Sequence, residues 1–282
     1  MPKALCLLHA NCQGDALRPL LENTPAFAEK FIIRQYTNYL RQEIAEADIA
    51  HCDLFLYQKL APRWGALSTQ QLLPRLPQQC LSIEIPNFFF KGYWPFWTNK
   101  IKGIDFADSL LEALLERGLD VSETLRLYER GDPLLLGDVA AVAEESLLRE
   151  EEKERDAPIR YVPLLREFWR SEQLFITVNH PGSRLLFHVA DSLLALLGLG
   201  QLPQSVRNAY EHPQDDFWLP IHPALGASPP HLPFATAERR YRIYATRLTH
   251  REYTASYLAC RQHGVTNLLA VLHDLPPNYP QV

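Results

Sequence analysis

The sequence predicts an α/β protein built on a doubly wound, mostly parallel β-sheet. Four short apolar runs, each bounded by turn residues, are typical of strands buried in such a sheet; they cover residues 4–10, 31–36, 53–57 and 81–85. Helix-forming segments separate them, so that strand and helix alternate about every 25 residues. A fifth apolar run, residues 174–178, predicts the last strand of the same sheet.

The segments between the strands can be placed in chain order. The first strand ends at Asn11-Cys12-Gln13-Gly14, and Pro19 predicts that a helix starts between residues 14 and 18, because proline fits the first turn of a helix. Shorter helices are expected over residues 40–50 and 68–73. Seven of the eleven residues 87–97 are aromatic, and this segment interrupts the alternation.

The second half of the chain is expected to be mainly helical. Helices are predicted over residues 106–155, where a run of both charge signs indicates a solvated face, over 185–199 and over 237–264. Residues 201–234 are rich in proline and are interpreted as an extended loop. We therefore predict an α/β catalytic domain of residues 1–200 with a helical insertion at about 104–170, and a C-terminal extension of residues 201–282 packed on it.

Composition limits the class of protein. A chain of 282 residues that is 47% hydrophobic can bury a full core. The net charge of -5 excludes a basic field for nucleic acid. The five cysteines are odd in number and lack a CxxC pair, which favours a reducing, cytoplasmic setting. No signal peptide is recognised, and no apolar run reaches the ~20 residues of a membrane span.

Two predicted strands end in reactive side chains. Cys12 follows the first strand and His180 follows the last, and the carboxyl ends of parallel strands share one edge of a sheet. A thiol and an imidazole brought together there form a nucleophile–base pair that can attack an acyl carbon. The backbone amides of Gln13 and Gly14, with the Gln13 side chain, are candidate oxyanion donors, and Asn179 is a candidate orienting residue.

Structural interpretations of these residues stay open. Cys12 is also the kind of small apolar residue that fills cores, and His180 is also typical of a loop histidine. The aromatic segment 87–97 is either a ligand wall or a satellite core, and the Arg- and Tyr-rich segment 237–264 is favoured as a surface helix. No metal is expected, because His9-x-x-Cys12 and His51-Cys52 lack the paired spacings of a zinc site.

The placement of Cys12 and His180 resembles SGNH-type esterases and acyltransferases, in which a nucleophile follows the first strand and a histidine follows the last. The resemblance implies an SGNH- or flavodoxin-like sheet. Cysteine replaces the serine of those enzymes here, and Thr177 stands where they carry an acidic residue three positions before the histidine. This departure implies a Cys–His dyad rather than a triad.

Three motifs resemble the WcbI-like family of capsular-polysaccharide biosynthesis proteins. They are NCQG after the first strand, IPNFFFKGYWP in mid-chain and LFITVNHPGSRLLF after the last strand, and the resemblance spans roughly residues 3 to 200. It implies an acetyl-coenzyme A-dependent O-acetyltransferase that acts on a sugar of a capsular or other surface polysaccharide. Coenzyme A would bind near the NCQG turn, and a saccharide would be the acceptor.

Side chains suited to coenzyme A lie near these motifs. Its phosphates need cations and its adenine needs flat apolar surfaces, which Phe88, Phe89, Tyr93 and Trp94 offer. The expected coenzyme A-binding residues are Asn11, Arg18, Lys59, Phe88, Tyr93 and Arg184.

Two other functions remain open at this stage. One is a thiol-dependent esterase or deacetylase of SGNH type, which uses the same dyad with water as the acceptor. The other is a non-catalytic coenzyme A-binding protein. The acceptor sugar, the acetylation of Cys12 itself and the formation of a homodimer are likewise left open.

Overall fold

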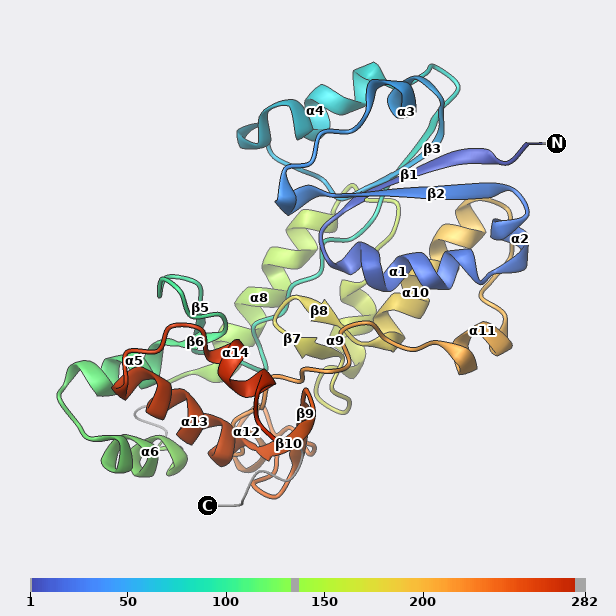
Figure 1. Cartoon of the computed structure of the whole chain (residues 1–282). Helices are drawn as coiled ribbons and strands as arrows, with labels where there is room; N and C mark the ends of the chain where they lie inside the picture. The colour runs from blue at the N-terminus through green and yellow to red at the C-terminus, as the bar shows by residue number, and fades with distance from the viewer. Residues whose placement is uncertain (1, 133–136, 277–282) are drawn as a thin grey trace. The chain divides into compact units, whose positions relative to one another are not determined.

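A computed structural model describes residues 2–132 and 137–276, and it divides the chain into two compact units (Figure 1). The first unit comprises Met1–Phe88, Glu150–Leu165 and Pro181–Pro213, and the second comprises Phe89–Arg149, Arg166–His180 and Gln214–Val282. This division differs from the expected one. Residues 201–213 belong with the α/β sheet of the first unit, and helices of the expected insertion are shared between the units, because packing rather than composition sets the boundary.

The first unit contains a four-stranded parallel sheet with the order β2-β1-β3-β4. Its strands are β1 (Ala4–Ala10), β2 (Phe31–Thr37), β3 (Cys52–Tyr57) and β4 (Leu81–Glu84). The predicted α/β fold class is thereby confirmed. Because β2 and β3 flank β1 on opposite sides, the direction of the strand order reverses at β1, and the ends of β1 and β3 form the switch point where α/β proteins bind ligands.

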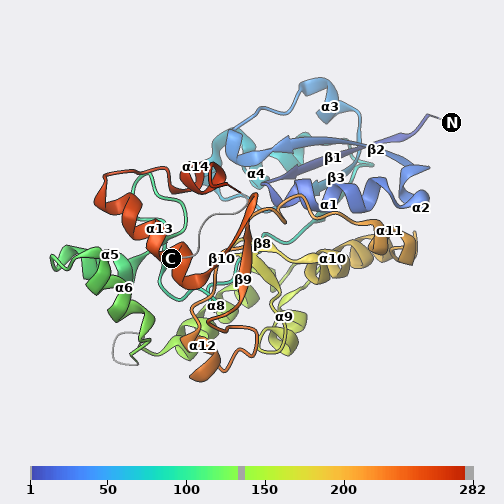
Figure 2. The same ribbon diagram turned by 60° about the horizontal axis from the view of Figure 1, so that its bottom comes forward.

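Helices cover both faces of this sheet. Helices α1 (Gln13–Glu22) and α10 (Ser183–Leu196) lie side by side on one face in both views (Figures 1 and 2). On the other face, Ile49 of α3 (Glu46–Ala50) and Leu72 of α4 (Thr69–Leu72) pack in one cluster with Leu7 and Phe55 of the sheet. The strands are therefore apolar on both sides, as the uninterrupted hydrophobic runs predict.

Helix α1 begins earlier than Pro19 predicts. Cys12 occupies the N-cap position, Gln13 is the first helical residue, and Pro19 lies inside the helix. Leu17 and Leu20 are buried, so that packing of the apolar face compensates for the backbone hydrogen bond that Pro19 lacks.

The expected fifth strand is real but does not join the four-stranded sheet. Strand β7 (Phe175–Thr177) instead forms a two-stranded sheet with β8 (His180–Pro181). Backbone carbonyls of this segment also accept hydrogen bonds from loop residues. Phe90 N–H donates to Val178 O at 2.7 Å, and Leu219 N–H donates to Ile176 O at 3.0 Å. An apolar run predicts a strand but not its partner, which explains the error.

The predicted helix over residues 237–264 is also wrong in its first part. Strands β9 (Arg240–Ile243) and β10 (Thr246–Thr249) form an antiparallel hairpin, and only then does α13 (His250–Gln262) begin. Along β9 exposed and buried residues alternate, with Tyr241 and Ile243 inside, which is the period of a strand. A capping box between Thr249 and Glu252 starts α13.

The remaining elements are short or belong to the helical part of the chain. In the second unit, α5 and α13 are joined through the buried Glu112 of α5. Its carboxylate accepts two hydrogen bonds from Arg261 of α13, at 2.8 and 2.7 Å. The other elements are α2 (Pro25–Ala28), β5 (Trp97–Thr98), β6 (Ala107–Asp108), α5 (Ser109–Glu116), α6 (Val121–Glu129), α8 (Val139–Glu154), α9 (Val162–Phe168), α11 (Gln204–Ala209), α12 (Ala224–Ala227) and α14 (Leu268–His273), with 3-10 turns at Asn38–Leu40, Pro62–Leu67 and Leu73–Arg75.

The described residues contain neither a membrane-spanning helix nor a cluster of side chains that could hold a metal ion. None of the described helices combines the length and the apolar character needed to cross a membrane. Nor do residues 2–132 and 137–276 bring three or more His, Cys, Asp or Glu side chains together in a group that could hold a metal ion.

A buried histidine in β1 predicts a loss of stability in acid. His9 is 1% exposed, its ring is stacked on Phe55, and its Nε2 has no hydrogen-bond partner among the residues that the structure describes. Burial lowers the pKa of His9 to about 4. In the unfolded chain the histidine has its ordinary pKa of about 6.5. Between about pH 6.5 and pH 4 the unfolded chain therefore binds a proton at His9 that the folded chain does not bind, and the free energy of unfolding falls as the pH drops through this range.

Between pH 7 and pH 4.5 we expect His9→Leu to reduce that loss by about 2 kcal/mol, most of the free energy equivalent of the pKa difference. The measurement is urea denaturation of both chains at pH 7 and pH 4.5. His222, whose pKa burial also lowers to about 4, should retain its own share of the pH dependence in the variant. The exposed His51 provides the control variant His51→Leu, and an equal change in both variants would contradict the assignment.

Candidate functional site

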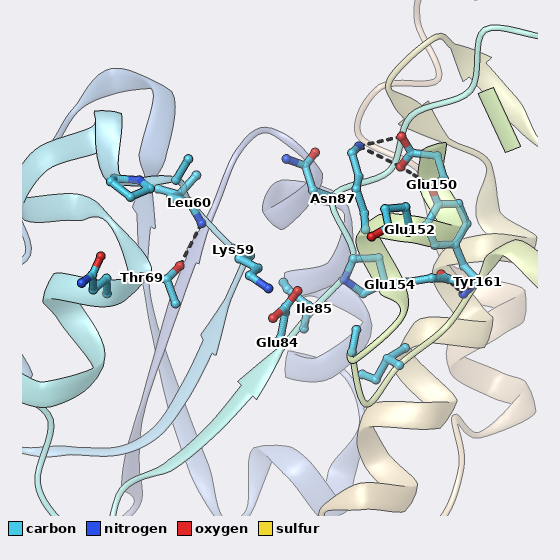
Figure 3. Close-up of a pocket in the computed structure, with 17 residues that line it drawn as sticks. Lys59, Leu60, Thr69, Glu84, Ile85, Asn87, Glu150, Glu152, Glu154 and Tyr161 are labelled. Carbon is cyan, nitrogen blue, oxygen red and sulfur yellow. Dashed lines mark hydrogen bonds and ion pairs between the residues drawn. The ribbon is translucent and has the colours of Figure 1, made fainter. Parts of the chain in front are cut away.

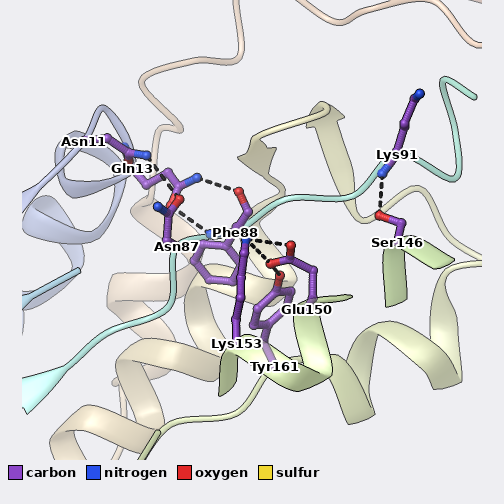
Figure 4. Close-up of polar contacts among 9 residues, drawn as sticks. All are labelled: Asn11, Gln13, Asn87, Phe88, Lys91, Ser146, Glu150, Lys153 and Tyr161. Atoms are coloured by element: carbon purple, nitrogen blue, oxygen red, sulfur yellow. Dashed lines mark hydrogen bonds and ion pairs between the residues drawn. The ribbon is translucent and has the colours of Figure 1, made fainter. Parts of the chain in front are cut away.

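The carboxyl edge of the parallel sheet carries a cluster of four amide side chains. Asn11 and Gln13 follow β1, Gln58 follows β3, and Asn87 follows β4. We call these four residues the amide cluster. Gln58 bonds to Gln13 and to the backbone of Asn11, and Asn11 bonds to Asn87, so that the ends of three strands are joined at the switch point of the sheet. Figure 4 shows Asn11, Gln13 and Asn87 of this cluster.

The Gln13 side chain links two segments by hydrogen bonds and is not an exposed donor. Its side chain is 3% exposed. Its Oε1 accepts from Gln58 Nε2 at 2.7 Å and from Phe88 N–H at 3.0 Å, and its Nε2 donates to Phe88 O at 2.9 Å. The side-chain amide thus satisfies both backbone groups of Phe88, as Figure 4 shows.

Gln58 completes the same network and was missed in the sequence. It is 1% exposed, its Oε1 accepts from Asn11 N–H at 2.8 Å, and its Nε2 also donates to Pro86 O at 3.1 Å. A polar residue placed directly after an apolar strand was the signal that could have identified it, as it did for Gln13.

Cys12 lies half-buried in this turn. Burial, reinforced by the negative charge of Asp15, raises the pKa of its thiol, although backbone hydrogen bonds at Cys12 and Gln13 act in the opposite direction. The thiol is therefore protonated at neutral pH, and nucleophilic attack from it needs a base that removes the proton.

The expected oxyanion donors already have partners. Gln13 N–H donates to Asn11 Oδ1 at 2.9 Å, and Gly14 N–H donates to Asn11 O at 2.9 Å. These bonds close the turn that presents Cys12, so we assign the two amides to the turn and not to an oxyanion. Packing also favours glycine at position 14, since a Cβ there would lie 3.0 Å from Ala10 Cβ, closer than an ordinary contact.

A pocket of about 690 Å³ opens beside the amide cluster, within the first unit (Figure 3). Leu60, Ile85 and Ile159 are among its apolar walls. Lys59 and Glu84 point toward each other across one side, and burial raises the pKa of Glu84 while Lys59 opposes the rise. The pocket is lined by Lys59, Leu60, Ala61, Pro62, Thr69, Gln70, Glu84, Ile85, Pro86, Asn87, Glu150, Glu152, Lys153, Glu154, Ala157, Ile159 and Tyr161.

The carboxylates of the opposite wall have structural partners. Tyr161 Oη donates to Glu150 Oε2 at 2.7 Å, and Lys153 Nζ lies 2.6 Å from Glu150 Oε1. Glu154 accepts from the N–H groups of Tyr161 at 2.8 Å and Val162 at 3.2 Å, and so satisfies the start of α9. Even so, four carboxylates and two ammonium groups line this pocket, which gives it an excess of negative charge.

The other residues expected to bind coenzyme A in the first unit are divided between surface and core. Arg18 pairs with Glu22 at 2.8 Å with both side chains about two-fifths exposed, at 42% and 41%. Arg184 is exposed in the first turn of α10. Phe88, in contrast, is 3% exposed and packs edge-on against Tyr161, so the structure places it in the core and its role as a ligand surface stays a prediction.

Most of the aromatic segment in the second unit is core. Tyr93 is completely buried, and its hydroxyl lies 2.8 Å from Trp169 O while accepting from Leu174 N–H at 3.2 Å. Trp94 Nε1 donates to Pro220 O at 3.0 Å. These two rings pack as the satellite core that was the alternative, and the ligand-binding role of Tyr93 stays a prediction. The backbone of this segment is fixed as well, through Lys91 N–H and Ser146 Oγ (Figure 4).

His180 and Asn179 follow β7 in the second unit. Asn179 Oδ1 accepts from Thr177 Oγ1 at 3.1 Å. Both residues line a second pocket, of about 870 Å³, together with Phe89 and Trp97. Because Cys12 belongs to the first unit and His180 to the second, the Cys12–His180 pair stays a prediction.

The strand order β2-β1-β3-β4 is that of a flavodoxin-like α/β sheet. The thiol of Cys12 at the end of β1 places the candidate site at the switch point of this sheet. The family model described as "Polysaccharide biosynthesis enzyme WcbI" matches residues 5–202. The chain therefore belongs to the WcbI family of polysaccharide biosynthesis enzymes, as the three motifs predict.

A solved structure of WcbI, described as a novel polysaccharide biosynthesis enzyme, has the same fold. The TM-score is 0.73 at 17% sequence identity, over 97% of this chain and 94% of that chain. That structure is described as the native protein without a disulfide bond between coenzyme A and one of its cysteines. Among curated proteins, none matches this chain.

Proposed function

We propose that the chain is an acetyl-coenzyme A-dependent O-acetyltransferase that acts on a sugar of a capsular or other surface polysaccharide. The observation that carries the proposal is the half-buried thiol of Cys12, held at the switch point of the sheet by the amide cluster. Membership of a polysaccharide biosynthesis family and the coenzyme A named for the similar WcbI structure support it.

The charges of the first unit suggest how coenzyme A binds. The acidic pocket repels phosphates, so we place them at Arg18 and Arg184, which stand on the neighbouring helices α1 and α10. The apolar side of the pocket suits the uncharged pantetheine arm, with Lys59 at its rim. Asn11 stays in the proposal as a residue of the turn next to the acyl group.

The raised pKa of Cys12 requires a base, and His180 is the proposed one. His180 takes the thiol proton, the Cys12 sulfur attacks the acetyl carbonyl, and the coenzyme A sulfur leaves with a proton returned from the imidazole. A sugar hydroxyl then loses its proton to His180 and attacks acetyl-Cys12, which restores the thiol. In the direct route His180 activates the hydroxyl, which attacks acetyl-coenzyme A, and Cys12 only orients the thioester.

Replacement of His180 tests the proposal in both routes. We expect His180→Gln to slow acetyl transfer by about 10²- to 10⁴-fold, the usual contribution of a general base, with coenzyme A affinity little changed. The rate of acetylated sugar formation and calorimetric titration with coenzyme A are the two measurements. His263→Gln, at an exposed histidine of the same unit, is the matched control and should keep full activity.

The products identify the class of reaction. Acetyl-coenzyme A consumption that depends on a saccharide acceptor supports the transferase. Equal hydrolysis with and without acceptor would instead indicate the esterase, and a His180→Gln variant with unchanged turnover would leave only a coenzyme A-binding protein.

A further inference from the structure

The pocket around His180 in the second unit has the character of a sugar-binding site. It measures about 870 Å³ and is open to solvent on one side. Four segments form it: Phe89 between β4 and β5, β5 with the loop that leads to β6, the residues that follow β7, and the start of α14. Its lining residues are Phe89, Trp97, Thr98, Asn99, Ile101, Lys102, Gly103, Ile104, Asp105, Phe106, Val178, Asn179, His180, Asn267 and Leu269.

Aromatic rings in this pocket are in contact with other rings and remain partly exposed. Phe89 meets Trp97 edge-on at 5.5 Å between ring centroids, and Phe106 is stacked on Phe217 at 5.4 Å. Trp97 makes no side-chain hydrogen bond within the described residues, whereas the indole of Trp94 nearby in the sequence is buried and bonded. A braced, partly exposed aromatic face is suited to stacking with the apolar face of a sugar ring.

Polar groups around the rings match the hydroxyls of a sugar. The side chains of Asn99 and Lys102 form no hydrogen bond or ion pair within the part of the chain that the structure describes. Asn267 Oδ1 accepts from Ala270 N–H at 3.1 Å, which commits its oxygen to α14 and leaves its Nδ2 as a donor. Such mixed amide and charged groups beside an apolar face fix the orientation of a small ligand.

The loop that carries these groups is held in place. Its ends are paired, with Trp97 opposite Asp108 in the β5–β6 ladder. Gly103 has φ of +81°, and a Cβ there would lie 3.1 Å from Thr266 Cβ, so the loop packs closely against the segment before α14. The backbone that carries the polar side chains of the pocket is therefore fixed before any ligand arrives, which lowers the entropy cost of binding.

We propose that this pocket binds the saccharide acceptor as an uncharged sugar ring stacked on Trp97, with Asn99 and Asn267 bonded to its hydroxyls and His180 next to the hydroxyl that reacts. The role of His180 rests on the proposed acetyltransferase function, whereas sugar binding by the pocket does not. Lys102 and Asp105 are the charged groups of the lining and offset each other, so the pocket suits a neutral sugar better than the phosphates of coenzyme A.

The pocket of the first unit is less suited to this ligand. Tyr161, its one aromatic lining residue, is 2% exposed and its hydroxyl donates to Glu150. Two of the carboxylates there, those of Glu150 and Glu154, are already bonded to protein groups. No ring face is presented on which a sugar could stack.

Binding of simple glycosides to the full chain, without coenzyme A, tests the proposal. The probes are methyl α-D-mannopyranoside, methyl β-D-glucopyranoside and N-acetylglucosamine, followed by saturation-transfer NMR and by tryptophan fluorescence. We expect at least one probe to bind, and Trp97→Ala to weaken it about tenfold or more, as loss of a stacked aromatic does. Trp218→Ala is the matched control, because Trp218 is a partly buried tryptophan of the same unit outside this pocket.

Asn99→Ala provides a second variant, at an exposed residue whose loss leaves folding intact, and should weaken binding about threefold. Failure of every probe to bind, or affinities that neither variant changes, would overturn the proposal. Glycoside binding that depends on Trp97 in a chain without acetyl transfer would remove the proposed function and leave the pocket assignment standing. Acetyl transfer with a KM for the sugar that Trp97→Ala does not change would remove the pocket assignment and leave the proposed function standing.

Discussion

Replacing Cys12 with alanine is expected to reduce acetyl transfer by about 10³-fold or more, the scale seen when a covalent nucleophile is removed. The reason is positional as well as chemical, because Cys12 provides the thiol in the turn that the amide cluster fixes at the switch point. Intact-mass spectrometry of the wild-type chain with acetyl-coenzyme A, without an acceptor, should show one added acetyl group. Cys12→Ala should show none.

Cys80 offers a matched control for this experiment. Of the five cysteines only Cys12 and Cys80 are half-buried, and burial raises the pKa of both thiols. Coenzyme A should slow iodoacetamide labelling of Cys12 and leave Cys80 unaffected, and Cys80→Ser should retain transfer. Because the Cys12 pKa is raised, its labelling rate in the free chain should keep rising above pH 9, the ordinary thiol pKa.

A Cys12→Ala chain with wild-type transfer would rule out the covalent route. The direct route, with His180 acting on the sugar hydroxyl, would then be the remaining mechanism for a transferase. An acetyl group found on another residue would likewise exclude Cys12 as the nucleophile.

Replacing Gln58 with alanine is expected to lower the free energy of unfolding by about 3 kcal/mol, a large fraction of the stability of a typical domain. Gln58 is 1% exposed, and its removal leaves Asn11 N–H and Pro86 O without the partner they have now, whereas Gln13 Oε1 keeps the hydrogen bond from Phe88 N–H. Each such buried group costs about 1–3 kcal/mol when left unbonded, partly offset where water enters. Urea denaturation followed by far-UV circular dichroism measures the change.

Gln71 is the control for the Gln58 variant. It is an exposed glutamine of α4 in the same unit, and Gln71→Ala should change stability by no more than about 0.5 kcal/mol. Gln58→Glu should be at least as destabilising as Gln58→Ala, because it buries a carboxylate whose second oxygen faces the acceptors Gln13 Oε1 and Pro86 O in place of a donor. Equal stabilities of the Gln58→Ala and Gln71→Ala chains would show that the amide cluster does not hold the strand ends together.

The four strands of the parallel sheet were predictable from the sequence to within a residue or so at each end. Residues 4–10 form β1 with the predicted bounds, and 31–36 and 53–57 differ from β2 and β3 by a single residue. The reason is that a strand buried on both faces must be apolar throughout, and turn residues end it. The position of Cys12 after β1 followed from the same pattern.

Errors arose where long-range partners decide the structure. The apolar run that forms β7 was expected in the main sheet, and the alternating segment 240–243 was expected to be helical. The burial of Phe88 and Tyr93 was likewise not foreseen, because aromatic rings serve both ligand sites and cores. The sequence lists such rings but does not say which neighbours cover them.

The amino-acid order alone therefore determined the α/β class, the strands of the parallel sheet and the placement of a thiol at the end of the first one, because these depend on local hydrophobic periodicity and on turn residues. Only the tertiary structure decided that Gln13 and Gln58 bind each other, that the amides next to Cys12 are already bonded, and that Trp97 lines a pocket while Tyr93 is buried. These features depend on contacts between residues distant in the chain, which desolvate some polar groups and rings and leave others exposed.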